Sequence, residues 1–168
     1  PHVCVCGKMV TVEGHHGLSC RHGSGRHSRH NQVNELLCRA FISCRTMATR
    51  EPHSLCTSDG KRPDGVTQVS WKRGRCLAWD ATCPDTFAQS HVQASSMQAG
   101  SATAAAEEKR KQKYSDIIPG VDFAPVAIET FGVWGKQVLD LITEVGRKIA
   151  EVTHDSRSTT FLRQRLSV

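Results

Sequence analysis

Two aspartates carry the clearest chemical potential in this sequence. Asp64 follows a Lys-Arg-Pro triplet, and Asp80 stands in the middle of the apolar run 76–83. A carboxylate inside an apolar strand costs free energy unless it is paired or bound to a cation. If the two segments lie side by side, their carboxylates repel each other and a divalent cation relieves the repulsion. The sequence therefore predicts that Asp64 and Asp80 share a metal ion.

The segments that contain these aspartates have the composition of strands. Residues 66–71 and 76–83 are rich in apolar and β-branched side chains, and a short turn joins them. Because side chains alternate along a strand, Asp80 shares a face with Thr82 and lies opposite Trp79. The turn between the strands is basic and contains Lys72, Arg73 and Arg75.

A second group of potential ligands lies near the N-terminus. Cysteine and histidine suit zinc, and four ligands close a structural tetrahedral site. The spacing favours the quartet Cys4, Cys6, His15 and Cys20. His16 is the alternative to His15 as the imidazole ligand.

Three helices are expected to surround the strands. Residues 31–44 have one apolar face at helical spacing, with Glu35 roughly opposite it. Glu35 is either a further metal ligand or an ordinary exposed carboxylate. Residues 136–152 form an amphipathic pattern that indicates core packing. The helix expected at 104–117 is basic, and its candidate functional side chains are Lys109, Arg110, Lys113 and Tyr114.

The chain divides into two parts by composition. We expect residues 1–30 to hold the zinc segment and a flexible basic linker from residue 21, and residues 31–168 to form the main domain. Residues 46–60 and 84–103 lack periodicity and are expected to be connections, the second a mobile one. A short helix is expected after residue 156.

Composition and charge limit the class of protein. The 168 residues are 38% hydrophobic and contain no apolar run long enough to span a membrane. The net charge is +6, and residues 1–75 hold 12 Lys and Arg against 5 Asp and Glu. This basic half suggests a nucleic-acid partner. The eight cysteines, with no secretory signal, indicate a reducing compartment, the nucleus or cytosol. We expect the chain to be a segment of a longer polypeptide.

The order of these motifs resembles the restriction-like endonuclease that follows the reverse transcriptase in one group of non-LTR retrotransposons. The shared marks are the zinc knuckle, Arg29-His30-Asn31 opening a helix, a Lys-Arg-Pro-Asp motif, a strand aspartate, and a basic helix that ends in Lys113-Tyr114. The likeness covers most of the chain. The resemblance implies an α/β fold of the PD-(D/E)XK type, a small mixed sheet flanked by helices behind a zinc knuckle.

The resemblance also implies an activity and its partners. The domain would nick target DNA with Mg²⁺ or Mn²⁺ held by Asp64 and Asp80, and the free 3′ hydroxyl would prime reverse transcription. Its partners would be DNA, possible element RNA and the upstream reverse transcriptase. The residues expected to contact nucleic acid are Arg29, His30, Lys61, Arg62, Lys72, Arg73, Arg75, Lys109, Arg110 and Tyr114.

One departure from the family pattern leaves an alternative open. The family fold expects a lysine two residues after the strand acid, where this chain has Thr82. In the retroelement branch a lysine on the later helix takes that place, and Lys113 occupies this position, with Arg110 at the first lysine of the Lys-x-x-Lys-Tyr mark. If neither reaches the metal site, the chain is a zinc-containing nucleic-acid-binding module without catalysis.

Overall fold

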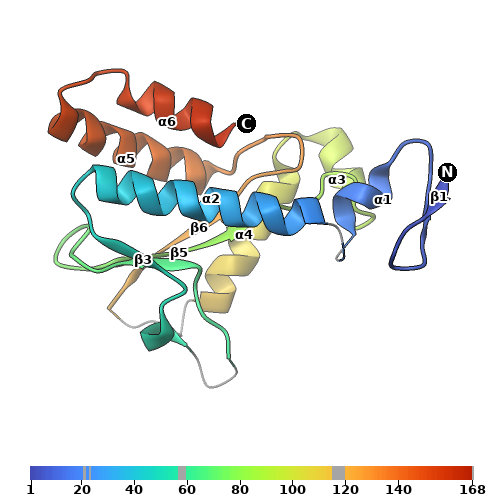
Figure 1. Cartoon of the computed structure of the whole chain (residues 1–168), viewed down its shortest axis with the longest axis horizontal. Helices are drawn as coiled ribbons and strands as arrows, with labels where there is room; N and C mark the ends of the chain where they lie inside the picture. The colour runs from blue at the N-terminus through green and yellow to red at the C-terminus, as the bar shows by residue number, and fades with distance from the viewer. Residues whose placement is uncertain (21, 23, 57–59, 115–119, 168) are drawn as a thin grey trace.

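The structure is a computed structural model that describes residues 1–20, 22, 24–56, 60–114 and 120–167, with the backbone alone described at residues 18, 19 and 24–26. Figure 1 shows the elements, which are in chain order β1 (His2–Val3), β2 (Met9–Val10), α1 (His15–Ser19), α2 (Ser24–Ser43), β3 (Ala48–Arg50), η1 (His53–Leu55), β4 (Gly65–Thr67), β5 (Leu77–Thr82), α3 (Val92–Met97), α4 (Ser101–Tyr114), β6 (Asp122–Ala127), α5 (Lys136–Thr153) and α6 (Ser158–Leu166).

A four-stranded mixed sheet organises the main part of the chain. Its strand order is β3-β4-β5-β6. Strand β4 is antiparallel to both of its neighbours, β3 and β5, whereas β5 is parallel to β6. The parallel pair requires a long crossover, which α3 and α4 provide. This arrangement confirms the expected small mixed sheet flanked by helices.

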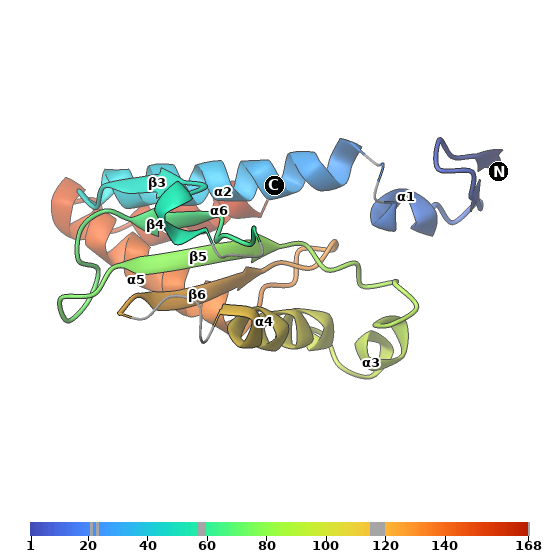
Figure 2. The same ribbon diagram turned by 90° about the horizontal axis from the view of Figure 1, so that it is seen from below.

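Helices cover both faces of the sheet. Figure 2 shows α2, α5 and α6 on one side of β5 and β6, and α4 on the other. The apolar stripe of α5 faces the sheet and forms much of the larger core, as expected for residues 136–152. None of the helices in the described ranges combines the length and the apolar composition that a membrane crossing requires.

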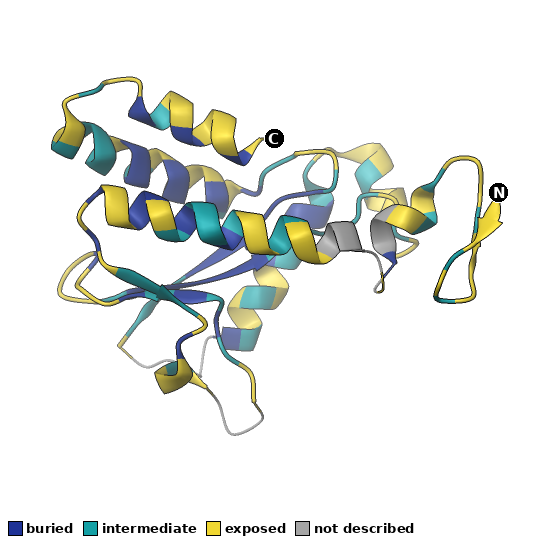
Figure 3. Cartoon of the chain, in the orientation of Figure 1, coloured by how far each residue is buried: buried dark blue, intermediate teal, exposed yellow. Residues whose placement is uncertain are grey.

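Strand β5 lies at the centre and is buried along most of its length (Figure 3). Its side chains alternate as predicted. Trp79 and Ala81 belong to the core beneath α2 and α5, whereas Ala78 packs with Tyr114 of α4 in a second, smaller core. Asp80 therefore faces α4, on the side opposite Trp79.

Several expectations about the connections are wrong. The helix expected to start at residue 31 begins at Ser24, so residues 24–30 are helical and not a flexible linker. The proposed boundary between residues 30 and 31 thus falls inside α2. The connection at 46–60 contains β3, and the one at 84–103 contains α3 and the start of α4. The end of the helix expected at 104–117 lies outside the described residues.

Candidate active site and metal centre

Asp80 is a buried carboxylate near the end of the central strand. It is 5% exposed. Its Oδ1 lies 2.7 Å from the Tyr114 hydroxyl, and its Oδ2 lies 3.0 Å from Arg110 Nε. The guanidinium is close enough for an ion pair but is not aligned for a hydrogen bond, so Oδ2 is buried without a hydrogen-bond donor. A buried carboxylate oxygen with a free lone pair is suited to a cation.

Asp64 lies just before β4 and is held from two directions. Its Oδ2 accepts the Ala81 backbone N–H at 2.7 Å and lies 2.9 Å from His30 Nε2. Asn34, one helical turn after His30, places its Nδ2 3.4 and 3.5 Å from the imidazole nitrogens and accepts the Trp79 indole N–H at 3.0 Å. Helix α2 thus fixes the orientation of Asp64 through a chain of polar contacts.

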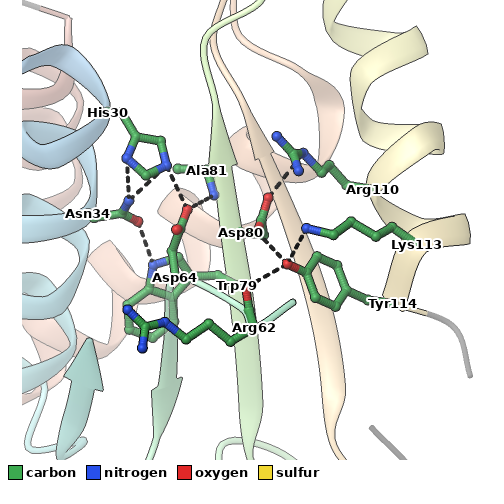
Figure 4. A network of polar contacts seen from close by, with 10 residues as sticks. All are labelled: His30, Asn34, Arg62, Asp64, Trp79, Asp80, Ala81, Arg110, Lys113 and Tyr114. Carbon is green, nitrogen blue, oxygen red and sulfur yellow. Dashed lines mark hydrogen bonds and ion pairs between the residues drawn. The ribbon is translucent and has the colours of Figure 1, made fainter. Parts of the chain in front are cut away.

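The two aspartates occupy adjacent positions of the sheet but point to different helices. Gly65 pairs with Trp79, so extending this antiparallel register by one residue sets Asp64 opposite Asp80. Figure 4 shows the Asp64 side chain directed toward His30 of α2 and the Asp80 side chain directed toward Arg110 of α4. The sequence prediction that they lie on neighbouring segments is confirmed, while their sharing of one ion stays a prediction.

The environments of the two carboxyls separate their pKa values. Burial raises the pKa of Asp80, and the nearby charge of Asp64 raises it further against the opposing effect of Arg110. Burial would also raise the pKa of Asp64, but the hydrogen bond and charge of His30 hold it below the ordinary value. The bond to Asp64 raises the pKa of His30 in turn. Asp64 and His30 therefore form an ion pair, whereas Asp80 ionises less readily than an ordinary aspartate.

The Tyr114 hydroxyl makes three short polar contacts beside Asp80. The phenol oxygen accepts a hydrogen bond from Lys113 Nζ at 2.7 Å, and lies 2.7 Å from both Asp80 Oδ1 and the Arg62 carbonyl oxygen. A phenol has one proton to donate. Tyr114 therefore donates either to Asp80 Oδ1 or to the Arg62 carbonyl oxygen, and not to both at once.

Lys113 and Arg110 reach the Asp80 side of the sheet from α4, as Figure 4 shows. Burial lowers the pKa of the Lys113 ammonium, which the charge of Asp80 partly offsets. Thr82, at the expected lysine position, lines a cavity of about 570 Å³ together with Lys109 and Arg110. The structure therefore gathers three basic residues of α4 around the end of β5.

Other basic residues expected to contact nucleic acid lie elsewhere. The turn before β5 is at the opposite end of that strand from Asp80, and there Lys72 pairs with Glu144 and Arg75 with Asp122. Arg73 in the same turn has a positive φ of 49°. Arg62 pairs with Glu51, and its neighbour Lys61 lies near enough to lower the pKa of Lys113. The basic turn is thus separated from the aspartates.

Glu35 does not join the aspartates. Its carboxylate accepts hydrogen bonds from Arg39 Nε at 2.7 Å and from Arg50 at 3.1 Å. These contacts hold the pKa of Glu35 below its ordinary value. The sequence left two alternatives for Glu35, a metal ligand or an ordinary exposed carboxylate. In the structure it is a partly exposed carboxylate that is paired with two arginines.

The N-terminal cysteines form a compact ligand cluster with His16. The ligand atoms of Cys4, Cys6, His16 and Cys20 all lie within 4.8 Å of one another. The Cys4 and Cys20 sulfurs are 3.6 Å apart, and Cys6 Sγ is 3.1 Å from His16 Nε2. Bonds of about 2.3 Å to sulfur and about 2.1 Å to nitrogen separate ligands of a tetrahedral zinc by roughly 3.5–3.8 Å. The cluster could bind a metal ion such as zinc.

Local structure explains how the cluster assembles and which histidine belongs to it. A turn with Gly7 at φ 83° brings Cys4 and Cys6 together. His16 lies in the first turn of α1 and Cys20 follows the last helical residue as its C-cap, four residues later, so both lie on one side of that short helix. The prediction of His15 as a ligand is wrong, because the ring of His15 stacks on Phe87 at a centroid distance of 4.5 Å.

The sequence interpretation missed the parts played by His30 and Asn34. His30 was expected to contact nucleic acid, yet it binds Asp64, and Asn34 was not singled out. Their i, i+4 spacing on a helix was the available signal. Arg29, which like His30 was expected to contact nucleic acid, lines a cavity on another flank of α2.

No known family model matches the sequence, and no curated protein is similar enough to count as a relative. The fold and side chains alone define the class. It is a mixed α/β protein with one aspartate on the central strand, another just before the neighbouring strand, and an N-terminal Cys/His cluster.

Proposed function

We propose that the chain is a metal-dependent DNA endonuclease module of the PD-(D/E)XK type that nicks target DNA for reverse transcription by a retrotransposon. The observation that carries the proposal is the buried Oδ2 of Asp80, which lacks a hydrogen-bond donor, together with the partly buried Asp64, which lies opposite Asp80 when the β4–β5 register is extended by one residue. In a purely structural ion pair, buried carboxylate oxygens usually accept hydrogen bonds. In the pair of Asp80 with Arg110, the buried Oδ2 of Asp80 accepts none.

In this proposal Asp64 and Asp80 hold a divalent cation, Mg²⁺ or Mn²⁺. The cation would activate a water for attack on phosphorus and stabilise charge on the leaving oxygen. His30 keeps Asp64 ionised and oriented through its 2.9 Å contact, and Tyr114 positions Asp80 through its 2.7 Å contact. Each aspartate therefore has a partner on a helix that restricts its movement.

Lys113 supplies the positive charge that Thr82 cannot. Its ammonium donates a hydrogen bond to the Tyr114 hydroxyl, which in turn contacts Asp80. The lysine therefore approaches Asp80 from helix α4. Arg110 neutralises Asp80 when the cation is absent. Both groups are available to a phosphate that enters between α4 and the end of β5.

Relaxation of supercoiled plasmid tests the proposal. Wild type should nick with Mg²⁺ or Mn²⁺, whereas Asp64→Ala and Asp80→Ala should lose at least about 100-fold in rate, because each removes a ligand of the cation. Asp122→Ala is a matched control, since Asp122 is a strand aspartate whose partner is Arg75 of the distant turn. Equal nicking by wild type and both site variants would rule out the proposed mechanism.

A second function is favoured by one observation, the Cys/His cluster combined with Thr82 in place of a strand lysine. The chain would then be a zinc-containing nucleic-acid-binding module without catalysis. Its binding to DNA or element RNA would weaken steeply with salt, and no metal-dependent nicking would accompany it. Under either function we propose a nuclear place of action and an upstream reverse transcriptase in the same polypeptide.

A further inference from the structure

A large cavity lies beside α2, on a different flank from His30 and Asn34. Its volume is about 860 Å³, which falls within the usual range of ligand sites. Arg29 of α2, Arg165 of α6 and Phe131 of the segment between β6 and α5 contribute to its walls. The other apolar walls are Val33, Leu36, Ile128 and Leu166. The cavity thus combines an apolar lining with guanidinium groups.

The charges that line this cavity do not balance. Glu35 is paired with both Arg39 and Arg50. Arg29 and Arg165 form no ion pair within the described part of the chain, and the Nε atoms of Arg29 and Arg50 are buried without a hydrogen-bond acceptor.

The remaining carboxylate of the cavity does not compensate these arginines. Glu129 is 4% exposed. Its oxygens accept hydrogen bonds from the Thr86 hydroxyl at 3.0 Å and from the Thr103 backbone N–H at 3.3 Å. Four arginines line the cavity against two glutamates, so it keeps unpaired donors and an excess of positive charge. It is therefore suited to an anion.

A row of exposed aromatic rings leads from α1 to this cavity. The aromatic row consists of His15, Phe87 and Phe131. His15 stacks on Phe87 at 4.5 Å, and Phe87 packs edge-on against Phe131 at 5.0 Å. The two phenylalanines remain 40% and 58% exposed. Contiguous exposed apolar rings usually mark a binding surface.

We propose that the aromatic row and the arginine-lined cavity bind a single-stranded segment of nucleic acid. A base stacks on Phe131, and the neighbouring phosphates pair with Arg29 and Arg165. Stacking rings beside a basic groove are the usual means of binding single strands, and in a duplex the base faces are already covered. This inference rests on the proposed function in taking nucleic acid as the ligand, but it does not depend on cleavage.

Fluorescence anisotropy with a short labelled oligothymidylate tests the proposal. The zinc-loaded full chain is used without added Mg²⁺, so that binding is measured apart from nicking. Wild type should bind the single strand more tightly than a duplex of the same length. Phe131→Ala should weaken single-strand binding about 10-fold, the effect of losing one stacked base. Phe161→Ala, at a phenylalanine of α6 that is 45% exposed, is the matched control and should bind as wild type.

The arginines are tested by the dependence of binding on salt. The double variant Arg29→Gln, Arg165→Gln should reduce the slope of log affinity against log salt by about 1.4, because each lost phosphate contact of a single strand contributes about 0.7. Arg163→Gln, on the same helix as Arg165 but bonded to Thr143, should leave the slope unchanged. Free thymidine monophosphate should compete only at far higher concentration than the oligonucleotide.

The outcomes separate this inference from the proposed function. Wild-type affinity in the Phe131 and double arginine variants would overturn the inference, as would a preference for duplex or a mononucleotide that binds as tightly as the oligonucleotide. If those variants lose single-strand binding while Asp64→Ala and Asp80→Ala still nick plasmid as wild type does, the inference holds and the nuclease mechanism fails. If nicking requires both aspartates but the wild type does not bind the single strand, the nuclease mechanism holds and the inference fails.

Discussion

At the scale of single residues, Asp80 is where packing and electrostatics conflict. Strand alternation buries its carboxyl under α4, where Arg110 offers charge but no aligned hydrogen bond. The Tyr114 hydroxyl has one proton for two oxygen neighbours, so it cannot donate to Asp80 and to the Arg62 carbonyl at once. Asp64 differs because His30 and the Ala81 N–H stabilise its charged form. Two carboxyls that lie opposite each other in the register thus have pKa values shifted in opposite directions.

This difference predicts how stability depends on pH in Asp80→Asn. The folded-state pKa of Asp80 is raised, so the wild type is favoured below the unfolded pKa of about 3.9 and loses stability as pH rises through the folded value. An amide does not ionise. The unfolding free energy of Asp80→Asn should therefore rise relative to wild type across that window, as measured by chemical denaturation of metal-free protein at a series of pH values. Asp122→Asn, at a partly exposed aspartate paired with Arg75, serves as the control, and a constant difference for Asp80→Asn would contradict the assignment.

At the scale of elements, periodicity decided which parts could be predicted. The stripe of α5 and the apolar run of β5 are regular enough that both appeared within a residue of their expected bounds. The first turns of α2 are basic and lack an apolar stripe, so helical structure before residue 31 had no signal. β3 has three residues, too few to show alternation.

Gly65 shows how tightly the elements around the site are fitted. A Cβ at this position would lie 2.0 Å from Trp79 Cζ2, because β4 crosses the face of the indole. Gly65→Ala should displace Trp79 from its bond to Asn34, and through Asn34 loosen His30 and Asp64. We expect a loss of about 1–3 kcal/mol of stability, the usual result of overpacking, together with reduced nicking. Urea denaturation measures the loss. Gly17→Ala, where an added Cβ meets nothing within 4 Å, is the control, and equal stability of the two variants would show that the indole adapts.

At the scale of the whole molecule, the chain has a packed sheet domain and a small N-terminal unit. The strands β1 and β2 are mainly exposed. Among the described side chains of residues 1–20, only that of Cys20 is buried. So little apolar burial does not stabilise a fold of this size, and a bound metal is the usual substitute. The sequence identified three of the four residues of the cluster. It could not distinguish His15 from His16, because the choice depends on which side of α1 faces the cysteines. It also depends on the stacking of His15 on Phe87, a residue distant in sequence.

This organisation predicts a local response to loss of metal. A zinc chelator should increase hydrogen exchange in residues 1–20 and leave α5 protected, since the core beneath α2 and α5 contains no side chain of the cluster. Mass spectrometry should find bound zinc in His15→Ala but not in His16→Ala or Cys20→Ser. Cys56→Ser, an exposed cysteine outside the cluster, is the control and should retain the ion. Zinc loss in His15→Ala would reverse the ligand assignment. Cooperative unfolding of the whole chain on chelation would show that the N-terminal unit and the sheet domain form a single folding unit.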